Sequence, residues 1–173
     1  LEYLLQYCGN RPVIFSSDYE NMLSPEELDR VAVHALEQIS GIQSFRLTNR
    51  IRTNAEISSF IQNMMCLPER KKGRHFPHVT VMYANDDREA DVLLSDAQHQ
   101  GYQVILNEAE PAICADRLAM VLDQRYFYDR QNYLRSDDRS VRRLFHQLNG
   151  AKEELLLVVK QNEPLYAVLL DLL

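Results

Sequence analysis

Short apolar runs that suit buried strands alternate along this chain with longer segments whose apolar residues recur at helical spacing. The clearest run is residues 78–83 (HVTVMY), followed by a helix that Asn85 or Asp86 caps and Gly101 closes. Further strands are predicted at residues 12–16, 45–47, 102–106, 118–122 and 154–160. Continuous apolar strands are typical of parallel sheets that are covered on both faces. We therefore expect an α/β fold with three layers, in which helices lie on both faces of a mainly parallel sheet.

Four further helices are predicted, each beginning at a residue whose side chain accepts a hydrogen bond from a free backbone N–H. They run from Ser24 to Gly41, from Thr53 or Asn54 to Pro68, from Ser140 to about Gly150, and from Asn162 to Leu173. In the second of these, the apolar residues at helical spacing are expected to point inward: Ile57, Phe60, Ile61, Met64 and Met65. Residues 123–140 are polar and rich in tyrosine, and we predict a loop or a hairpin there.

The length of 173 residues suits one domain, and we expect residues 1–173 to form a single domain. Because the chain begins with Leu1 rather than Met, we also expect it to be a piece of a longer protein. No run approaches the ~20 apolar residues of a membrane helix, so we expect no contact with a membrane. Three cysteines (Cys8, Cys66 and Cys114) lack the spacing of a zinc site, and reduced, mostly buried thiols would fit a cytoplasmic protein.

Catalytic and phosphate-binding motifs are missing from the sequence. There is no Gly-rich phosphate loop of the GxxxxGK or GxGxxG type, no HxExxH pair and no GxSxG turn. Asp86 and Asp87 are interpreted as a helix start, and Asp137 and Asp138 as solvated loop residues. We predict no metal site, and residue spacing alone identifies no active site.

Two arginines, Arg50 and Arg52, lie within residues 47–54 (LTNRIRTN), where a predicted strand passes into a helix. Guanidinium groups at such a position can bind an anion near the helix N-terminus. Surface arginines beside a helix cap are the ordinary alternative, and the net charge of −6 is unusual for a free-standing nucleic-acid-binding protein.

Three segments resemble motifs of superfamily-1 helicases. Residues 47–54, with the helix that follows them, are similar to the segment Leu-x-x-Asn-Tyr-Arg-Ser; residues 13–21 (VIFSSDYEN) resemble motif III and residues 142–159 (RRLFHQLNGAKEELLLVV) resemble motif VI. In order and spacing, nearly the whole chain resembles the C-terminal RecA-like domain of such a helicase. It looks nearest to a bacterial helicase-like family related to the helicase part of Schlafen proteins. The resemblance implies a RecA-like fold, related to the P-loop NTPases.

The resemblance also implies roles for individual residues. Five would contribute to a nucleotide site: Arg52, Asp18, Asn21, Asp116 and Lys152. Among them, Arg52 takes the place of the arginine that reaches the γ-phosphate of ATP across an interdomain cleft. Arg50 and Asn49 would be the candidates for contact with a nucleic-acid strand.

Three positions depart from the helicase pattern. Asn21 replaces the glutamine of motif III, and residues 112–116 keep only Asp116 of the motif V pattern Gly-x-Glu-Phe-Asp. Gly150 replaces the arginine of motif VI. In the helicases that arginine acts like an arginine finger, which can raise the rate of nucleotide hydrolysis by ~10³ or more. Lys152 lies nearby, but an ammonium cannot copy a bidentate guanidinium. We therefore expect hydrolysis to be lost or nearly lost.

Three functions stay open at this point. The first is the C-terminal domain of a DNA or RNA helicase or ATPase, which would bind ATP and Mg²⁺ only together with a missing upstream RecA-like domain, and which would also contact single-stranded DNA or RNA. On its own this chain should not hydrolyse ATP. The second is a non-catalytic, helicase-derived interaction or regulatory module, which the replacements at Asn21, Cys114 and Gly150 favour. A stand-alone enzyme is the third and least supported possibility, since no nucleophile or metal cluster stands out.

Overall fold

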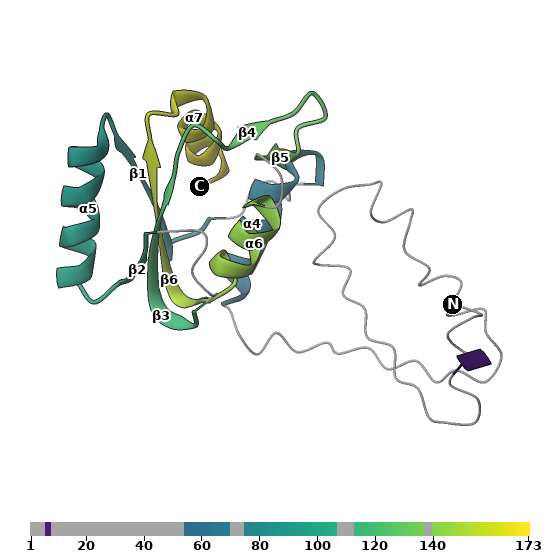
Figure 1. The fold of residues 1–173 in the computed structure, drawn as a ribbon, viewed down its shortest axis with the longest axis horizontal. Helices are drawn as coiled ribbons and strands as arrows, with labels where there is room; N and C mark the ends of the chain where they lie inside the picture. Colours follow the sequence, from purple (N-terminus) through teal and green to yellow (C-terminus); the bar gives the residue numbers. More distant parts are fainter. Residues whose placement is uncertain (1–5, 8–53, 70–74, 107–112, 137–139) are drawn as a thin grey trace. The chain divides into compact units, whose positions relative to one another are not determined.

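The computed structural model describes residues 6–7, 54–69, 75–106, 113–136 and 140–173 (Figure 1). The strands predicted at 12–16 and 45–47 and the helix predicted from Ser24 to Gly41 lie outside these residues.

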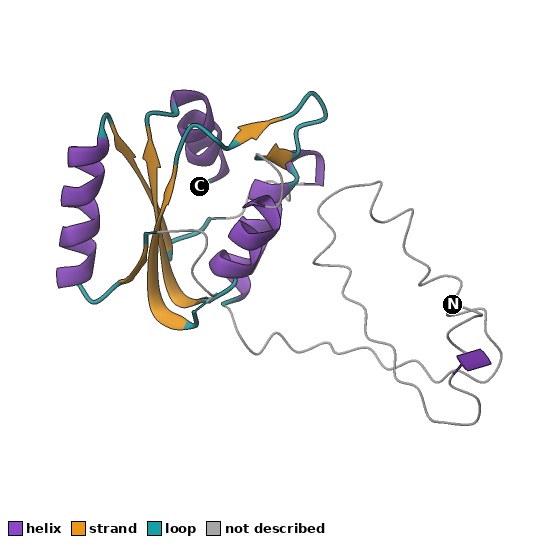
Figure 2. Ribbon diagram, in the orientation of Figure 1, coloured by secondary structure: helices purple, strands orange, loops and turns teal. Residues whose placement is uncertain are grey.

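A parallel sheet forms the middle layer of the described structure (Figures 1 and 2). Its four strands, in spatial order, are β1 (Val79–Ala84), β6 (Ala151–Lys160), β3 (Ala115–Leu122) and β2 (Gln103–Ile105). Every pair of neighbours in this sheet is parallel. The amino ends of all four strands therefore meet at one edge, and the carboxyl ends meet at the opposite edge.

Helices cover both faces of this sheet, as predicted (Figure 1). One face is covered by α5 (Asp87–His99). The other face is covered by α4 (Ala55–Met65), α6 (Ser140–Leu148) and α7 (Glu163–Leu172). The fold is thus a three-layer α/β sandwich, an arrangement consistent with a RecA-like domain.

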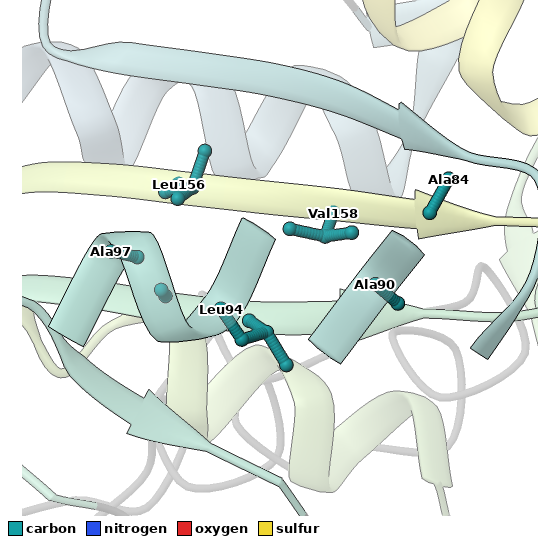
Figure 3. Packing of buried hydrophobic residues seen from close by; sticks show 7 residues of the cluster. Ala84, Ala90, Leu94, Ala97, Leu156 and Val158 are labelled. Atoms are coloured by element: carbon teal, nitrogen blue, oxygen red, sulfur yellow. The ribbon is translucent and has the colours of Figure 1, made fainter. Parts of the chain in front are cut away.

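The central strand β6 is apolar on both faces because both are buried. Leu156 and Val158 pack against Ala90 and Leu94 of α5, as Figure 3 shows. The alternate residues Leu155, Leu157 and Val159 are fully buried and point to the opposite face, since successive strand residues alternate. This double burial explains the continuous LLLVV run that identified the strand in the sequence.

Three helix caps match the predicted ones, whereas Ser140, predicted as a cap, is the first residue of α6. Asn54 begins α4, and its Oδ1 accepts a hydrogen bond of 2.9 Å from the backbone N–H of Glu56. Asp86 caps α5, and Asn162 caps α7. The residues of α4 that were expected to point inward are all buried: Ile57, Phe60, Ile61, Met64 and Met65. Gly101 follows α5 with a φ of 87°, a conformation that favours glycine.

Residues 127–135 form a hairpin, one of the two predicted alternatives. Its strands are β4 (Phe127–Tyr128) and β5 (Leu134–Arg135), which pair in antiparallel fashion. Asp129 organises the turn: Oδ1 accepts from the N–H groups of Gln131 and Tyr133, both at 2.9 Å, and Oδ2 accepts from Arg135 Nε at 2.7 Å.

Two strands begin earlier than predicted. The expected bounds were 118–122 and 154–160, whereas β3 begins at Ala115 and β6 at Ala151. The extra residues are largely polar and exposed, so hydropathy did not mark them as strand. The thiols also differ from expectation: Cys66 and Cys114 are free, but Cys114 is exposed and Cys66 is only partly buried.

Candidate functional site

An ion pair lies at the amino ends of the two central strands. Asp116 is the second residue of β3, and Lys152 is the second residue of β6. Lys152 Nζ lies 3.3 Å from Asp116 Oδ1, and both side chains are largely open to solvent. The structure therefore brings together the two predicted nucleotide-site residues that it describes.

The pairing of β3 with β6 is irregular beside this ion pair. Ala115 pairs with Ala151, but Arg117 pairs with Glu154, so β6 contains one residue more than β3 over this stretch. An extra residue of this kind is a β-bulge, which bends a strand and changes the direction of nearby side chains. The ion pair thus forms at a local distortion of the sheet.

Gly150, directly before β6, is buried under a neighbouring backbone segment. A Cβ at this position would lie 1.9 Å from the carbonyl oxygen of Ile113. The Gly150 carbonyl oxygen also accepts a hydrogen bond of 3.0 Å from Ala115 N–H. Glycine is required here because only a residue without Cβ permits this approach. Position 150, which the resemblance aligns with the motif VI arginine, therefore has no room for a side chain in this backbone arrangement.

The start of α4 lies at the same edge of the sheet. The backbone N–H of Asn54 donates a hydrogen bond of 3.1 Å to the carbonyl oxygen of Lys152. Glu56, in the first turn of α4, lies 2.7 Å from Nδ1 of His78, the residue before β1. The end of the LTNRIRTN segment is thus attached to the first residues of β6.

We call the surface formed by Asn54, Asp116, Gly150 and Lys152 the amino-end surface. The other predicted site residues lie outside the described part of the chain: Asp18, Asn21, Asn49, Arg50 and Arg52.

A second polar network beside this surface was not predicted. Arg117 Nη2 lies 3.0 Å from Glu154 Oε1, and Arg117 Nη1 donates to the carbonyl oxygen of Gln100 at 2.9 Å. The Tyr102 hydroxyl donates to Glu154 Oε2 at 2.6 Å, and burial together with this hydrogen bond raises the pKa of Tyr102 to about 12. The network holds the end of α5 against the sheet, which is a structural role.

Charged residues also gather at the opposite edge. Lys160, the last residue of β6, lies 2.6 Å from Asp87 at the start of α5. Arg125 Nε donates to both carboxylate oxygens of Asp123, at 2.9 and 3.0 Å. Sequence reasoning missed these residues, although polar positions directly after parallel strands are where ligands bind in such sheets.

The chemistry available at the amino-end surface is limited. A phosphate group would meet one ammonium there, that of Lys152, which already pairs with Asp116. Within the described residues, no group of three or more His, Cys, Asp or Glu side chains is arranged to hold a metal ion. The described residues of this surface do not form a complete catalytic centre by themselves.

Comparison of the chain with protein-family models, curated proteins and solved structures finds no match. A relationship to superfamily-1 helicases is therefore a hypothesis that depends on the resemblance of segments such as 13–21, 47–54 and 142–159. Among the helices that the structure describes, none has the length and hydropathy needed to cross a membrane.

Proposed function

We propose that this chain is the second RecA-like domain of a helicase-type protein and that its amino-end surface faces a nucleotide cleft shared with an upstream domain. One observation supports this most directly, the hydrogen bond of 3.1 Å between Asn54 N–H and the Lys152 carbonyl oxygen. It joins the end of residues 47–54 to residues 142–159, the two segments that resemble cleft-lining motifs of such helicases.

In this proposal the upstream domain supplies the phosphate loop and the Mg²⁺ carboxylate. Arg52 of this chain contacts the γ-phosphate, Asp18 and Asn21 contribute polar groups, and Arg50 and Asn49 contact a single strand of DNA or RNA. ATP and Mg²⁺ bind only when both domains are present. We place the protein in the cytoplasm, where free thiols such as Cys114 are stable.

A calorimetric titration of the full-length protein with a non-hydrolysable ATP analogue tests the proposal. Binding is expected, and Arg52→Ala should weaken it by about tenfold or more, since charge-assisted contacts to phosphate are strong. Arg88→Ala is the matched control, because Arg88 is an exposed arginine on α5 at the opposite edge of the sheet. Equal affinities of the wild type and Arg52→Ala would contradict the assigned role.

The packing of Gly150 against Ile113 favours a second candidate, a helicase-derived module that no longer binds or hydrolyses nucleotide. A missing finger arginine alone removes orders of magnitude in rate. If the folded full-length protein fails to bind the analogue, with or without single-stranded DNA or RNA, this interaction or regulatory role is the one supported.

A further inference from the structure

A cavity of about 180 Å³ lies at the carboxyl ends of β2, β3 and β6, beside the first turns of α5. It is at the opposite edge of the sheet from the amino-end surface. In open parallel sheets, ligands bind outside the carboxyl ends of the strands, where successive connections leave toward opposite faces. Here β1 leads into α5 on one face, and its neighbour β6 leads into α7 on the other (Figure 1).

One wall of the cavity is apolar. Ala90 and Leu94 of α5 belong to the cluster that packs on the sheet in Figure 3, and Val121 of β3 packs against that cluster. Leu106, directly after β2, lines the cavity while remaining 69% exposed. An aliphatic group that entered the cavity would cover this leucine and remove apolar surface from water.

Among the charged residues that line the cavity in the described part of the chain, one carboxylate has no cationic partner. Both cations are already held by carboxylates, Lys160 by Asp87 and Arg125 by Asp123. Asp91 lies one helical turn after Asp87, is exposed, and has no hydrogen-bond or ion-pair partner among the described residues. Three acids against two bases give the lining a surplus negative charge, which disfavours anions and favours a cation.

The size of the cavity limits what enters it. Pockets for drug-sized ligands measure roughly 300–1,000 Å³, so this one is too small for a nucleotide. A cavity of this volume is on the scale of a single side chain. An aliphatic wall that ends at an unpaired carboxylate complements a side chain with a long apolar stem and a cationic end.

We propose that this cavity receives one lysine or arginine side chain of a partner polypeptide, with its stem against Leu94 and Leu106 and its charged end at Asp91. The assignment does not depend on the helicase-type function proposed above, because it uses residues at the other edge of the sheet.

Nuclear magnetic resonance titration of the 173-residue chain provides the test. The probes are three blocked heptapeptides of glycine and alanine whose central residue is arginine, lysine or norleucine. The arginine and lysine peptides should shift the amide signals of Asp91 and Leu106. The norleucine peptide, which keeps the stem and lacks the charge, should bind about fivefold more weakly or worse.

Asp91→Asn should reduce binding of both basic peptides by about fivefold, to the level of the norleucine peptide. Asp96→Asn is the matched control, because Asp96 is exposed on the same helix and does not line the cavity. Leu106→Ser should weaken all three peptides. Thermal unfolding of each variant checks that the fold is intact.

Two results would overturn the proposal. One is equal binding of the basic peptides by the wild type and Asp91→Asn. The other is binding of free agmatine more tightly than the arginine peptide, which would assign the cavity to a small free amine.

Discussion

The carbonyl oxygen of Ile113 lies so close to Gly150 that a Cβ on residue 150 would stand only 1.9 Å from it. Heavy atoms that are not bonded essentially never approach so closely, and the obstacle is backbone rather than a movable side chain. The Gly150 carbonyl oxygen also accepts a hydrogen bond from Ala115 N–H, and Gly150 N–H donates one to the carbonyl oxygen of Gln147. The glycine is therefore fixed in place on both sides.

Gly150→Ala should destabilise the protein by about 3 kcal/mol or more, because the segment at Ile113 must move to admit the methyl group. Thermal or urea unfolding measures this loss. Gly101→Ala is the control, since a Cβ there meets nothing within 4 Å and only the φ of 87° opposes it. That substitution should cost about 1–2 kcal/mol. A Gly150→Ala protein as stable as the wild type would show that the 113 segment adapts easily.

The same contact predicts the outcome of restoring the helicase arginine. Gly150→Arg should unfold the protein or disturb its sheet rather than create ATP hydrolysis, because the larger side chain meets the same carbonyl oxygen. Circular dichroism and phosphate release by the full-length variant would check this. Measurable hydrolysis by a folded variant would contradict it.

Asn162→Ala should cost about 2–4 kcal/mol. Asn162 Nδ2 donates to the carbonyl oxygens of Asp123 and Tyr126, at 2.9 and 2.8 Å, and Oδ1 accepts from Leu165 N–H at 3.2 Å. The substitution removes the cap of α7 and both hydrogen bonds from the amide to backbone carbonyl oxygens. Asn85→Ala, at an exposed asparagine bonded to Glu89, should change the unfolding free energy by about 0.5 kcal/mol or less. Similar losses in the two variants would count against this account.

The hairpin should lose stability in acid through Asp129. Burial alone would raise the pKa of this carboxyl, but the hydrogen bonds from Tyr133, Arg135 and Gln131 outweigh it and hold the pKa below its usual range. A lowered pKa contributes stability that is present above the ordinary aspartate pKa and is lost as the pH falls through the folded value.

Unfolding free energies of the wild type and Asp129→Ala between about pH 6 and pH 2 test this expectation. The gap between them, about 1–3 kcal/mol near neutrality, should narrow as the pH falls below about 4. If the difference in unfolding free energy between the wild type and Asp129→Ala stayed constant with pH, the charged form of Asp129 would not be the cause of that difference.

The Asp116–Lys152 ion pair should contribute little to stability. Both side chains are largely exposed, and pairs of that kind contribute about 0–1 kcal/mol. Asp116→Asn and Lys152→Met should therefore unfold within about 1 kcal/mol of the wild type. A much larger loss in either variant would give the pair a structural role instead of the proposed one at a nucleotide cleft.

Features set by neighbouring residues were predictable from the sequence. Each cap accepts a hydrogen bond from a backbone N–H two or three residues further along the chain, as Asn54, Asp86 and Asn162 show. The continuous apolar run of β6 likewise indicates that both faces of this strand are buried. Local pattern therefore recovered the strands and helices of the described residues and their division into layers.

Features that join distant residues were not predictable in the same way. Nothing in the sequence relates Gly150 to Ile113, or Lys160 to Asp87, because these contacts depend on strand order. The resemblance to helicases assigned Asp116 and Lys152 to one nucleotide site, but their ion pair was not predicted. The bulge beside it follows from one extra residue in β6, which hydropathy does not reveal.

The position of β6 also bears on how the chain acquires its structure during synthesis. This strand lies between β1 and β3 in space but comes after both along the chain. Until residues 151–160 leave the ribosome, β1 has no neighbouring strand within the described sheet, and the edges of β1 and β3 that pair with β6 stay open. Assembly of the described sheet must therefore wait for β6, and until then the unpaired strand edges are open to aggregation or to chaperone binding.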